Sequence, residues 1–343
     1  MKNIIDKLYN TKTVSDIELE KLLNSTTDLY LTQKAVERRI KYYGDMVYIR
    51  GLIEFSNYCK NNCLYCGIRK DNIALSRYRL TKNDILMCAD KGYKLGFRTF
   101  VLQGGEDLHY TDKEICDIVY SIKENYPDCA ITLSIGEKSK DSYTAYKSSG
   151  ADRYLLRHET ADNEHYNKLH PESMSLDIRK RCLWDLKELG YQVGSGFMVG
   201  SPYQTTGTII KDLRFLEELQ PDMIGIGPFL PHHDTPFSHM SYGSLELTLK
   251  LISILRLMFP YSLIPSTTAL ATLSPTGRKD GILCGANVVM PNLSPANLRK
   301  FYSLYNDKAS SGNESAEAKD KLAEEMNSIG YRIVTDIGNV KRD

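Results

Sequence analysis

The chain has 343 residues, with 44 lysines and arginines against 43 aspartates and glutamates, so its formal net charge is +1. This balance gives no reason to expect bulk attraction to nucleic acid or to anionic lipid. No stretch approaches the roughly 20 apolar residues of a membrane span, and the N-terminal residues Met1–Lys7 lack the apolar core of a signal peptide. We therefore expect a cytoplasmic protein that binds neither nucleic acid nor membrane.

The first predicted elements are helices over residues 1–45, where Ser15 and Glu18 have the spacing of a helix start. A regular alternation of strands and helices follows. The predicted strands are 47–55, 99–102, 130–135, 153–156, 191–199, 223–227, 263–266 and 287–290. The predicted helices between and after them are 81–95, 112–126, 143–149, 175–189, 205–219, 245–258 and 294–305, with a further charged helix at 317–327.

This alternation predicts the α/β class and, within it, a complete (β/α)8 barrel of the TIM type. The alternative is an open doubly wound sheet, but no G-x-G-x-x-G follows the first strand. We divide the chain into an N-terminal helical segment (1–45), a barrel (46–305) and a short C-terminal extension (306–343), which we expect to pack on the barrel exterior. In such a barrel the segments that follow the strands meet at one face, where active sites lie.

Cys59, Cys63 and Cys66 follow the first strand with the spacing C-x3-C-x2-C. Three thiolates can hold three corners of a [4Fe–4S] cluster and leave the fourth iron open to a small molecule, as catalytic metal sites do. The alternative is a structural zinc loop, which requires four ligands. The next cysteine is Cys88 and no histidine lies close by, so the pattern favours the cluster. The other five cysteines are scattered among apolar neighbours, which is typical of buried thiols.

Two further polar segments follow predicted strands. After the second strand come Gln103, Gly104, Gly105 and Glu106. The glycines allow close backbone approach to a ligand, and Glu106 could bind an ammonium group. After the fourth strand, Arg157 and Glu159 could grip a carboxylate and a ribose, whereas His158 between them is more typical of a structural residue. Arg179 or Arg181 on the next helix could hold a carboxylate in a bidentate contact.

The remaining candidates lie at the ends of other strands. Met198, in a glycine-rich strand end, suits an apolar wall against a nucleoside, although such an end also turns a tight corner. Thr267 and Thr268 end the seventh strand, and Thr132 and Ser134 lie on the third. Their hydroxyl groups could bind an anion or a substrate carboxylate.

The cysteine motif, with Tyr65 directly before the third cysteine, resembles that of the radical S-adenosylmethionine (SAM) enzymes. The resemblance implies that SAM chelates the open iron and is reductively cleaved to a 5'-deoxyadenosyl radical. It also implies that Tyr65 lies near the adenine. The segment Gln103–Glu106 resembles the part of these enzymes that contacts the SAM amino group.

Residues 48–305 resemble the HydE family of [FeFe]-hydrogenase maturases, in the biotin-synthase-like branch. The segments that carry the resemblance are 53–57, 77–79, 101–107, 152–160, 225–229, 265–268 and 284–292. Some members hold an accessory cluster through cysteines near the C-terminus. This chain has no cysteine after Cys284, so we expect no accessory cluster, which also weighs against a biotin synthase.

This family resemblance implies a role in assembling the di-iron subcluster of the hydrogenase H-cluster. The substrate would be a cysteine-bearing iron carbonyl-cyanide species delivered by another maturase. It would lie deeper in the barrel, held by Arg157, Thr132, Thr267 and Thr268, with Tyr305 at the cavity. A one-electron donor such as ferredoxin or flavodoxin is implied as a further partner.

Two alternatives remain at this point. One is a radical SAM mutase like the enzyme that makes methylornithine from lysine. The other is a non-catalytic iron–sulfur or zinc protein that binds partners. The segments around Gly105 and Glu159 favour the maturase over the mutase.

Overall fold

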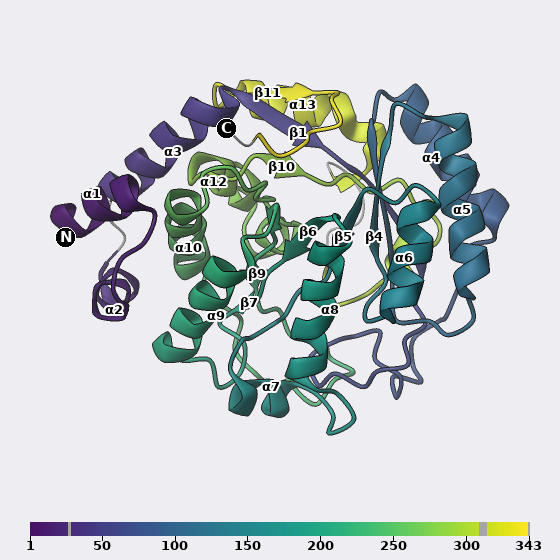
Figure 1. The fold of residues 1–343 in the computed structure, drawn as a ribbon, viewed down its shortest axis with the longest axis horizontal. Helices are drawn as coiled ribbons and strands as arrows, with labels where there is room; N and C mark the ends of the chain where they lie inside the picture. Colours follow the sequence, from purple (N-terminus) through teal and green to yellow (C-terminus); the bar gives the residue numbers. More distant parts are fainter. Residues whose placement is uncertain (27–28, 309–313, 342–343) are drawn as a thin grey trace.

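The computed structural model describes residues 1–26, 29–308 and 314–341. Its first helices are α1 (Lys2–Thr11), α2 (Asp16–Asn24) and α3 (Leu29–Tyr43). The start of α2 is as predicted: the Glu18 backbone N–H donates to Ser15 Oγ at 3.3 Å, and the Ser15 N–H donates to the Glu18 carboxylate at 2.8 Å. Helix α3 packs against α10 (Leu245–Met258) and leads into the first strand (Figure 1).

The strands that follow run parallel and form a ring. They are β1 (Met46–Ile49), β2 (Gly51–Ser56), β3 (Thr99–Gly104), β4 (Ala130–Ser134), β5 (Arg153–Leu155), β6 (Gln192–Ser195), β7 (Met198–Val199), β8 (Met223–Ile224), β9 (Gly227–Pro228) and β10 (Val288–Val289). The main sheet has the order β2-β3-β4-β5-β6-β8, and β10 pairs with β1. Single bridges from Met223 to Leu263 and from Pro265 to Val288 complete the circuit. The predicted barrel is therefore confirmed, with its seventh strand reduced to these bridges.

Helices cover the outside of this ring (Figure 1). They are α4 (Lys82–Lys94), α5 (Asp112–Asn125), α6 (Lys140–Ser148), α8 (Leu176–Glu188), α9 (Thr206–Leu219), α10 and α12 (Gly277–Leu283). Three short helices among the described residues were not predicted from the sequence: α7 (Asn163–Leu169), α11 (Thr268–Leu273) and α12. The first follows the carboxyl end of β5, and the other two follow the seventh strand.

The helix predicted over 294–305 is wrong, because this segment contains only the 3-10 turn η1 (Arg299–Phe301). Backbone hydrogen bonds within it reach back only three residues, as from the Phe301 N–H to the Leu298 carbonyl, and the residues at its start bond to β2. The Leu293 N–H donates to the Leu52 carbonyl at 2.7 Å, and the Glu54 N–H donates to Ser294 Oγ at 2.7 Å. Pro295 also restricts the residue before it to extended conformations.

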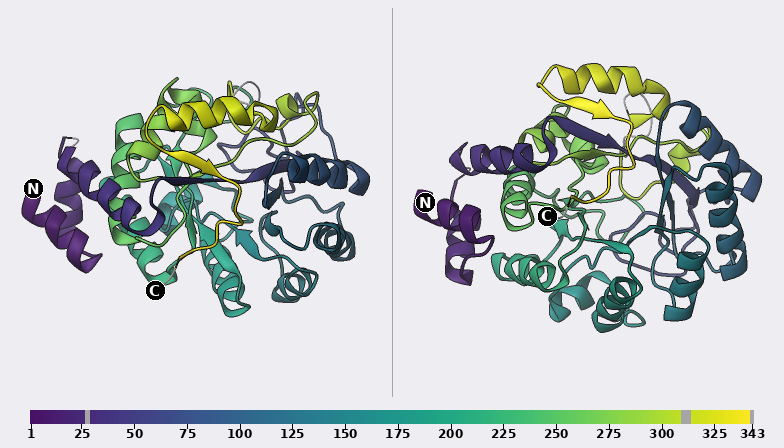
Figure 2. Two further views of the ribbon diagram at one scale, coloured as in Figure 1. Left: turned by 90° about the horizontal axis from the view of Figure 1, so that it is seen from above. Right: turned by 45° about the horizontal axis from the view of Figure 1, so that its top comes forward.

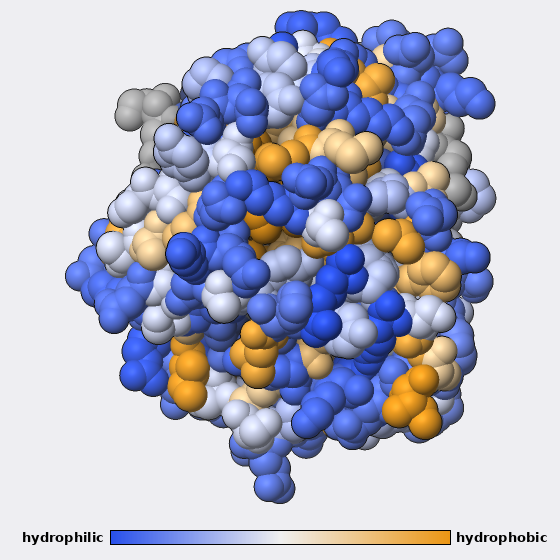
Figure 3. All heavy atoms as spheres, turned by 90° about the vertical axis from the view of Figure 1, so that its right-hand side faces the viewer, coloured by the Kyte–Doolittle hydropathy of each residue, from blue (hydrophilic) through white to orange (hydrophobic). Residues whose placement is uncertain are grey.

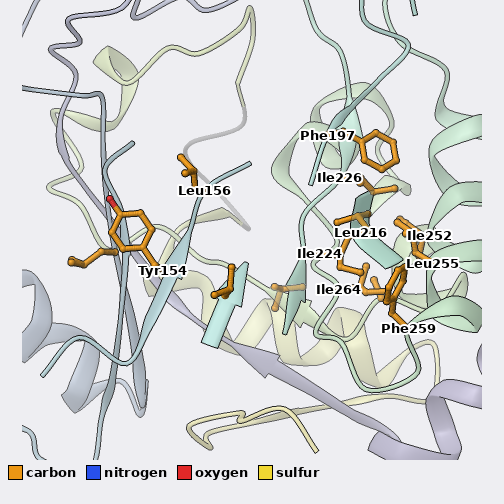
Figure 4. Close-up of a cluster of buried hydrophobic side chains, with 14 of the residues drawn as sticks. Tyr154, Leu156, Phe197, Leu216, Ile224, Ile226, Ile252, Leu255, Phe259 and Ile264 are labelled. Atoms are coloured by element: carbon orange, nitrogen blue, oxygen red, sulfur yellow. The ribbon is translucent and has the colours of Figure 1, made fainter. Parts of the chain in front are cut away.

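A close-packed apolar layer lies between the strands and the outer helices. Figure 4 shows Ile224 and Ile264 from the ring facing Leu216 of α9 and Leu255 of α10. Each of these four side chains is fully buried. Burial of one such side chain contributes about 1.5–3 kcal/mol to the free energy of unfolding. This layer therefore holds the strands, and with them the segments that follow their ends, in place.

The C-terminal extension contains α13 (Lys319–Asn327) and β11 (Arg332–Val334), which pairs in parallel with β1 (Figure 2). Arg153 at the start of β5 then holds the following residues, donating to the carbonyls of Ile337 and Gly338 and to Asn339 Oδ1 at 2.7–3.2 Å. This tail therefore crosses the amino ends of the strands, opposite the face where the site is expected. Residues 309–313 of the predicted extension lie outside the described residues.

The surface shown in Figure 3 is mostly hydrophilic, with hydrophobic side chains in small separate groups. Among the helices within the described ranges, none combines the length and the apolar composition needed to cross a membrane.

Candidate active site

The three motif cysteines lie in the loop after β2, and all three face a cavity at the carboxyl ends of the strands. Burial raises the pKa of the Cys59 and Cys63 thiols, and it raises the pKa of Cys66 to about 12. Thiols in such surroundings stay protonated near neutral pH unless a cation stabilises the thiolate form. The three side chains thus fit a shared metal centre that supplies this positive charge.

The loop after β3 is tied directly to the cysteine loop. Asp107 receives two hydrogen bonds from the Arg79 guanidinium, at 2.7 and 2.9 Å, and a third from Ser56 Oγ at 2.6 Å. Gly105 packs so tightly that a Cβ there would lie 2.1 Å from the Tyr58 carbonyl oxygen and 2.8 Å from Cys59 Cβ. Only glycine fits at this contact, so the two loops form one unit around the cysteines.

The cavity has a volume of about 350 Å³, within the range of small-molecule sites. Thr132 and Arg181 do not line it, whereas fifteen of the predicted site residues do: Cys59, Cys63, Tyr65, Cys66, Gln103, Gly104, Gly105, Glu106, Arg157, Glu159, Arg179, Met198, Thr267, Thr268 and Tyr305. Residues from six strand ends therefore converge, although they are far apart in the sequence. Apolar side chains such as Leu155 and Met223, which lie earlier along the strands, form the inner wall.

Thr132 lies on β4, fully buried, and it is not part of the cavity wall. Ser134, two residues further along the same strand, does line the cavity. Because residues two apart on a strand share a face, Thr132 points into the barrel one layer below the cavity. A substrate in the cavity would meet Ser134 first.

Arg179 on α8 is a buried cation among carboxylates and a tyrosine. Its Nε lies 3.0 Å from Glu137 Oε1 and 3.3 Å from the Tyr166 hydroxyl, and its Nη2 lies 3.8 Å from Glu106 Oε1. Glu106 also pairs with Lys60 at 3.1 Å. Of the two arginines considered on this helix, Arg179 reaches the cavity, whereas Arg181 is exposed on the outside.

Glu159 adopts a left-handed backbone conformation, with φ of 64°, that places its carboxylate in the cavity beside Arg157. Arg157 Nη2 lies 3.2 Å from Glu159 Oε2. His158 between them is fully buried behind the wall, where its ring nitrogens contact Ser195 Oγ at 2.9 Å and Asp212 Oδ1 at 3.2 Å. This buried network agrees with the structural interpretation of His158 and holds the strained turn in place.

Several polar atoms around the cavity lack a hydrogen-bond partner among the described residues. They include Arg157 Nε, Thr267 Oγ1 and Thr132 Oγ1. Buried polar atoms in folded proteins are almost always paired. These atoms are therefore suited to bind a polar or anionic ligand inside the barrel.

Sequence reasoning missed four polar residues of the cavity wall: Glu54, Asn61, Tyr302 and Lys308. Glu54 is fully buried, accepts from Asn292 Nδ2 at 2.8 Å and pairs with the Lys308 ammonium. Its carboxylate within an otherwise apolar strand is a signal that could have identified it. Lys308 lies in the predicted C-terminal extension, where no pattern indicates a cavity residue.

Three thiols beside an open cavity, at the carboxyl ends of a parallel barrel, define the class of radical SAM enzymes. The model of the "Radical SAM superfamily" matches residues 53–216. The maturase subunit HydE of [FeFe] hydrogenase from Thermotoga maritima is 50% identical over 275 residues, which cover 80% of this chain and 78% of that protein. The chain therefore belongs to the HydE family of this superfamily, which implies a [4Fe–4S] cluster and SAM as its cofactors.

Other relatives agree with this fold. The 3-methylornithine synthase of Methanosarcina acetivorans is 31% identical over 83% of this chain and 81% of that protein. The crystal structure of methylornithine synthase (PylB) superimposes with a TM-score of 0.84 at 28% identity, covering 96% of this chain and 97% of that one. The maturase HydG superimposes with a TM-score of 0.82 over 97% of this chain and 75% of that one, and at 22% identity it supports the fold alone.

Proposed function

We propose that this protein acts in the assembly of the di-iron subcluster of the [FeFe]-hydrogenase H-cluster. The observation that carries the proposal is the 50% identity with a HydE maturase over 80% of this chain, whose barrel encloses one continuous cavity beside the three cysteines. When bound, the cluster and SAM supply reductive cleavage of SAM to a 5'-deoxyadenosyl radical. The protein binds and orients the reactants and excludes water from them.

The residues near the cavity mouth would hold the cofactors. Cys59, Cys63 and Cys66 would bind three irons, and the remaining iron would be open to the amino and carboxylate groups of SAM. Glu106 offers a carboxylate for the amino group, and Arg179 offers a guanidinium for the carboxylate. Tyr65 and Met198 would flank the nucleoside, and Glu159 would bind the ribose. Gln103 and Gly104 would complete the wall beside the cluster.

The substrate would lie on the inner side of the cavity. Arg157, Thr267 and Thr268 provide a cation and hydroxyl groups suited to an anionic iron carbonyl-cyanide species that carries a cysteine. The unpaired Arg157 Nε and Thr267 Oγ1 support this assignment. Thr132 would act from the layer below, and Tyr305 from the mouth side. Another hydrogenase maturase would supply the substrate, and a ferredoxin or flavodoxin would supply the electron.

The first experiment is anaerobic reconstitution with iron and sulfide, followed by EPR of the reduced protein with and without SAM. We expect a [4Fe–4S]+ signal that changes when SAM is added, together with formation of 5'-deoxyadenosine. Cys66→Ala should lose the signal. Cys88→Ala on α4 is the matched control and should retain it, because Cys88 is buried outside the cavity wall. A cluster that does not respond to SAM would contradict the proposal.

A second assay separates the maturase from the mutase, which the similarity to 3-methylornithine synthase keeps as the second candidate. Reconstituted protein is added to a cell-free hydrogenase maturation reaction that lacks only this component. In parallel it is incubated with lysine, SAM and reductant. Hydrogenase activation without methylornithine supports the maturase, whereas methylornithine formation assigns the protein to the mutase.

A further inference from the structure

The short helix α7 contacts the cysteine loop from the side of the barrel mouth. Figure 1 shows α7 at the same end of the molecule as the loop that leads from β2 to α4. The Leu64 N–H donates to the carbonyl of Leu169, the last residue of α7, at 2.9 Å. The next residue, His170, is almost fully buried against Tyr65. The motif tyrosine is therefore contacted by an element that the barrel pattern does not require.

The hydrogen bonds of His170 define which of its nitrogens carries the proton. Its Nδ1 lies 3.0 Å from the Tyr166 carbonyl oxygen, which can only accept, so Nδ1 is the protonated nitrogen. Its Nε2 then has a free lone pair and lies 3.1 Å from the Tyr65 hydroxyl. Tyr65 therefore donates to His170. Burial lowers the pKa of His170 to about 3, so the ring stays neutral and keeps this acceptor at neutral pH.

Tyr166 contacts both His170 and Arg179, the residue proposed to hold the SAM carboxylate. Its ring stacks on His170 with centroids 3.9 Å apart, and its hydroxyl lies 3.3 Å from Arg179 Nε. The His170 ring is thus held by a backbone carbonyl and by a stacked ring. A side chain fixed in this way can restrict the rotation of the tyrosine that donates to it.

We propose that His170 is a positioning residue for SAM: it fixes the Tyr65 ring in the orientation that packs against the adenine. The inference rests on the proposed function, because it requires a SAM site beside Tyr65. His170 itself does not line the cavity, so it acts through Tyr65. Without this acceptor the tyrosine would rotate more freely, and SAM would lose binding free energy in ordering it.

The test compares His170→Phe, Tyr65→Phe and the double variant, each with a reconstituted cluster. The dissociation constant of SAM is measured by equilibrium dialysis, with the SAM-induced EPR change as a second readout. One neutral hydrogen bond corresponds to roughly a fivefold to tenfold change in affinity. We expect this weakening in each single variant and no further weakening in the double variant. Multiplying effects, or wild-type affinity in His170→Phe, would overturn the proposal.

His170→Gln provides a rescue, because its amide oxygen can occupy the position of Nε2 and accept from Tyr65. We expect its SAM affinity to lie within about twofold of wild type. If His170→Phe fails to hold the cluster, His170→Asn replaces it. This side chain can still reach the Tyr166 carbonyl, but it is too short to accept from Tyr65. Equal SAM affinities in the Asn and Gln variants would overturn the proposal.

A direct readout uses the cluster-free protein labelled with 15N histidine. We expect the NMR spectrum to show His170 as the neutral Nδ1–H tautomer, and an Nε2–H tautomer would overturn the proposal. Failure of the proposed function is distinguishable from failure of this inference. In the first case the wild-type protein binds no SAM, whereas in the second the wild type binds SAM and the His170 variants bind it equally well.

Discussion

The substitution Gly136→Ala tests whether Glu106 binds the amino group of SAM. Gly136 has φ of +79°, and a Cβ on it would lie 1.9 Å from Glu106 Cγ and 2.3 Å from its carboxyl carbon. The alanine therefore forces the Glu106 side chain out of its place in the cavity wall. Gly190→Ala is the matched control, because Gly190 has φ of +76° with no atom within 4 Å of the added Cβ among the described residues.

The expected magnitudes separate two effects. A left-handed alanine costs about 1–2 kcal/mol of stability in both variants. Only Gly136→Ala also moves the carboxylate, which would lose a charge-assisted hydrogen bond to the SAM ammonium worth about 1.5–3 kcal/mol. This loss corresponds to SAM binding about 10- to 150-fold weaker than in wild type. Gly190→Ala should bind SAM with wild-type affinity.

Urea unfolding of both variants gives the common stability loss, and equilibrium dialysis of the reconstituted proteins gives the dissociation constant of SAM. Glu106→Gln should weaken SAM binding in the same direction without the backbone strain. If Gly136→Ala and Gly190→Ala bind SAM equally well, Glu106 does not hold the amino group and its assignment is wrong.

Three further predictions concern stability. Burial lowers the pKa of His170 in the folded state to about 3, so the contribution of this residue to the free energy of unfolding is complete above pH 6.5 and falls as the pH decreases. The cluster-free protein should lose about 2 kcal/mol of this free energy between pH 7 and 5 because of His170. Urea titrations at the two pH values should show a smaller loss in His170→Phe. Leu255→Ala should lower the free energy of unfolding by about 2–5 kcal/mol, whereas Met87→Ala, on an exposed face of α4, should change it by less than about 0.5 kcal/mol. Arg153→Met removes the hydrogen bonds to residues 337–339. Limited proteolysis followed by mass spectrometry should therefore show cleavage in this tail at least about tenfold faster than in wild type. An unchanged cleavage rate would contradict the role of Arg153 in holding the tail.

Much of the site could be predicted because its signals are local. The cysteine spacing needs no knowledge of tertiary structure, and the polar residues after β3 and β5 stand where apolar strands end. The alternation of strands and helices then places these segments on one face of a barrel. Fifteen of the predicted residues line the cavity as a result. Thr132 differs because the sequence gives its strand but not its depth along the barrel axis.

The parts that could not be predicted depend on long-range contacts. Helix α7 is only seven residues long and its role arises from the approach of Leu169 to Leu64. The segment after β10 does not form the predicted helix, because residues at its start bond to β2. Local helix propensity does not include such long-range contacts. Lys308 lies in the cavity wall because its ammonium group pairs with Glu54 and donates to the Tyr302 carbonyl.

The pairing of β1 with both β10 and β11 has a consequence for how the protein is made. Strand β1 is synthesised early, just before β2 and the cysteines, but its neighbours β10 and β11 are synthesised only after the other strands of the barrel. Pairings between residues so far apart in sequence form slowly. The cysteines thus leave the ribosome long before their enclosure exists. Cluster insertion into the finished barrel would avoid exposing iron and sulfide to a half-formed, water-filled site during translation.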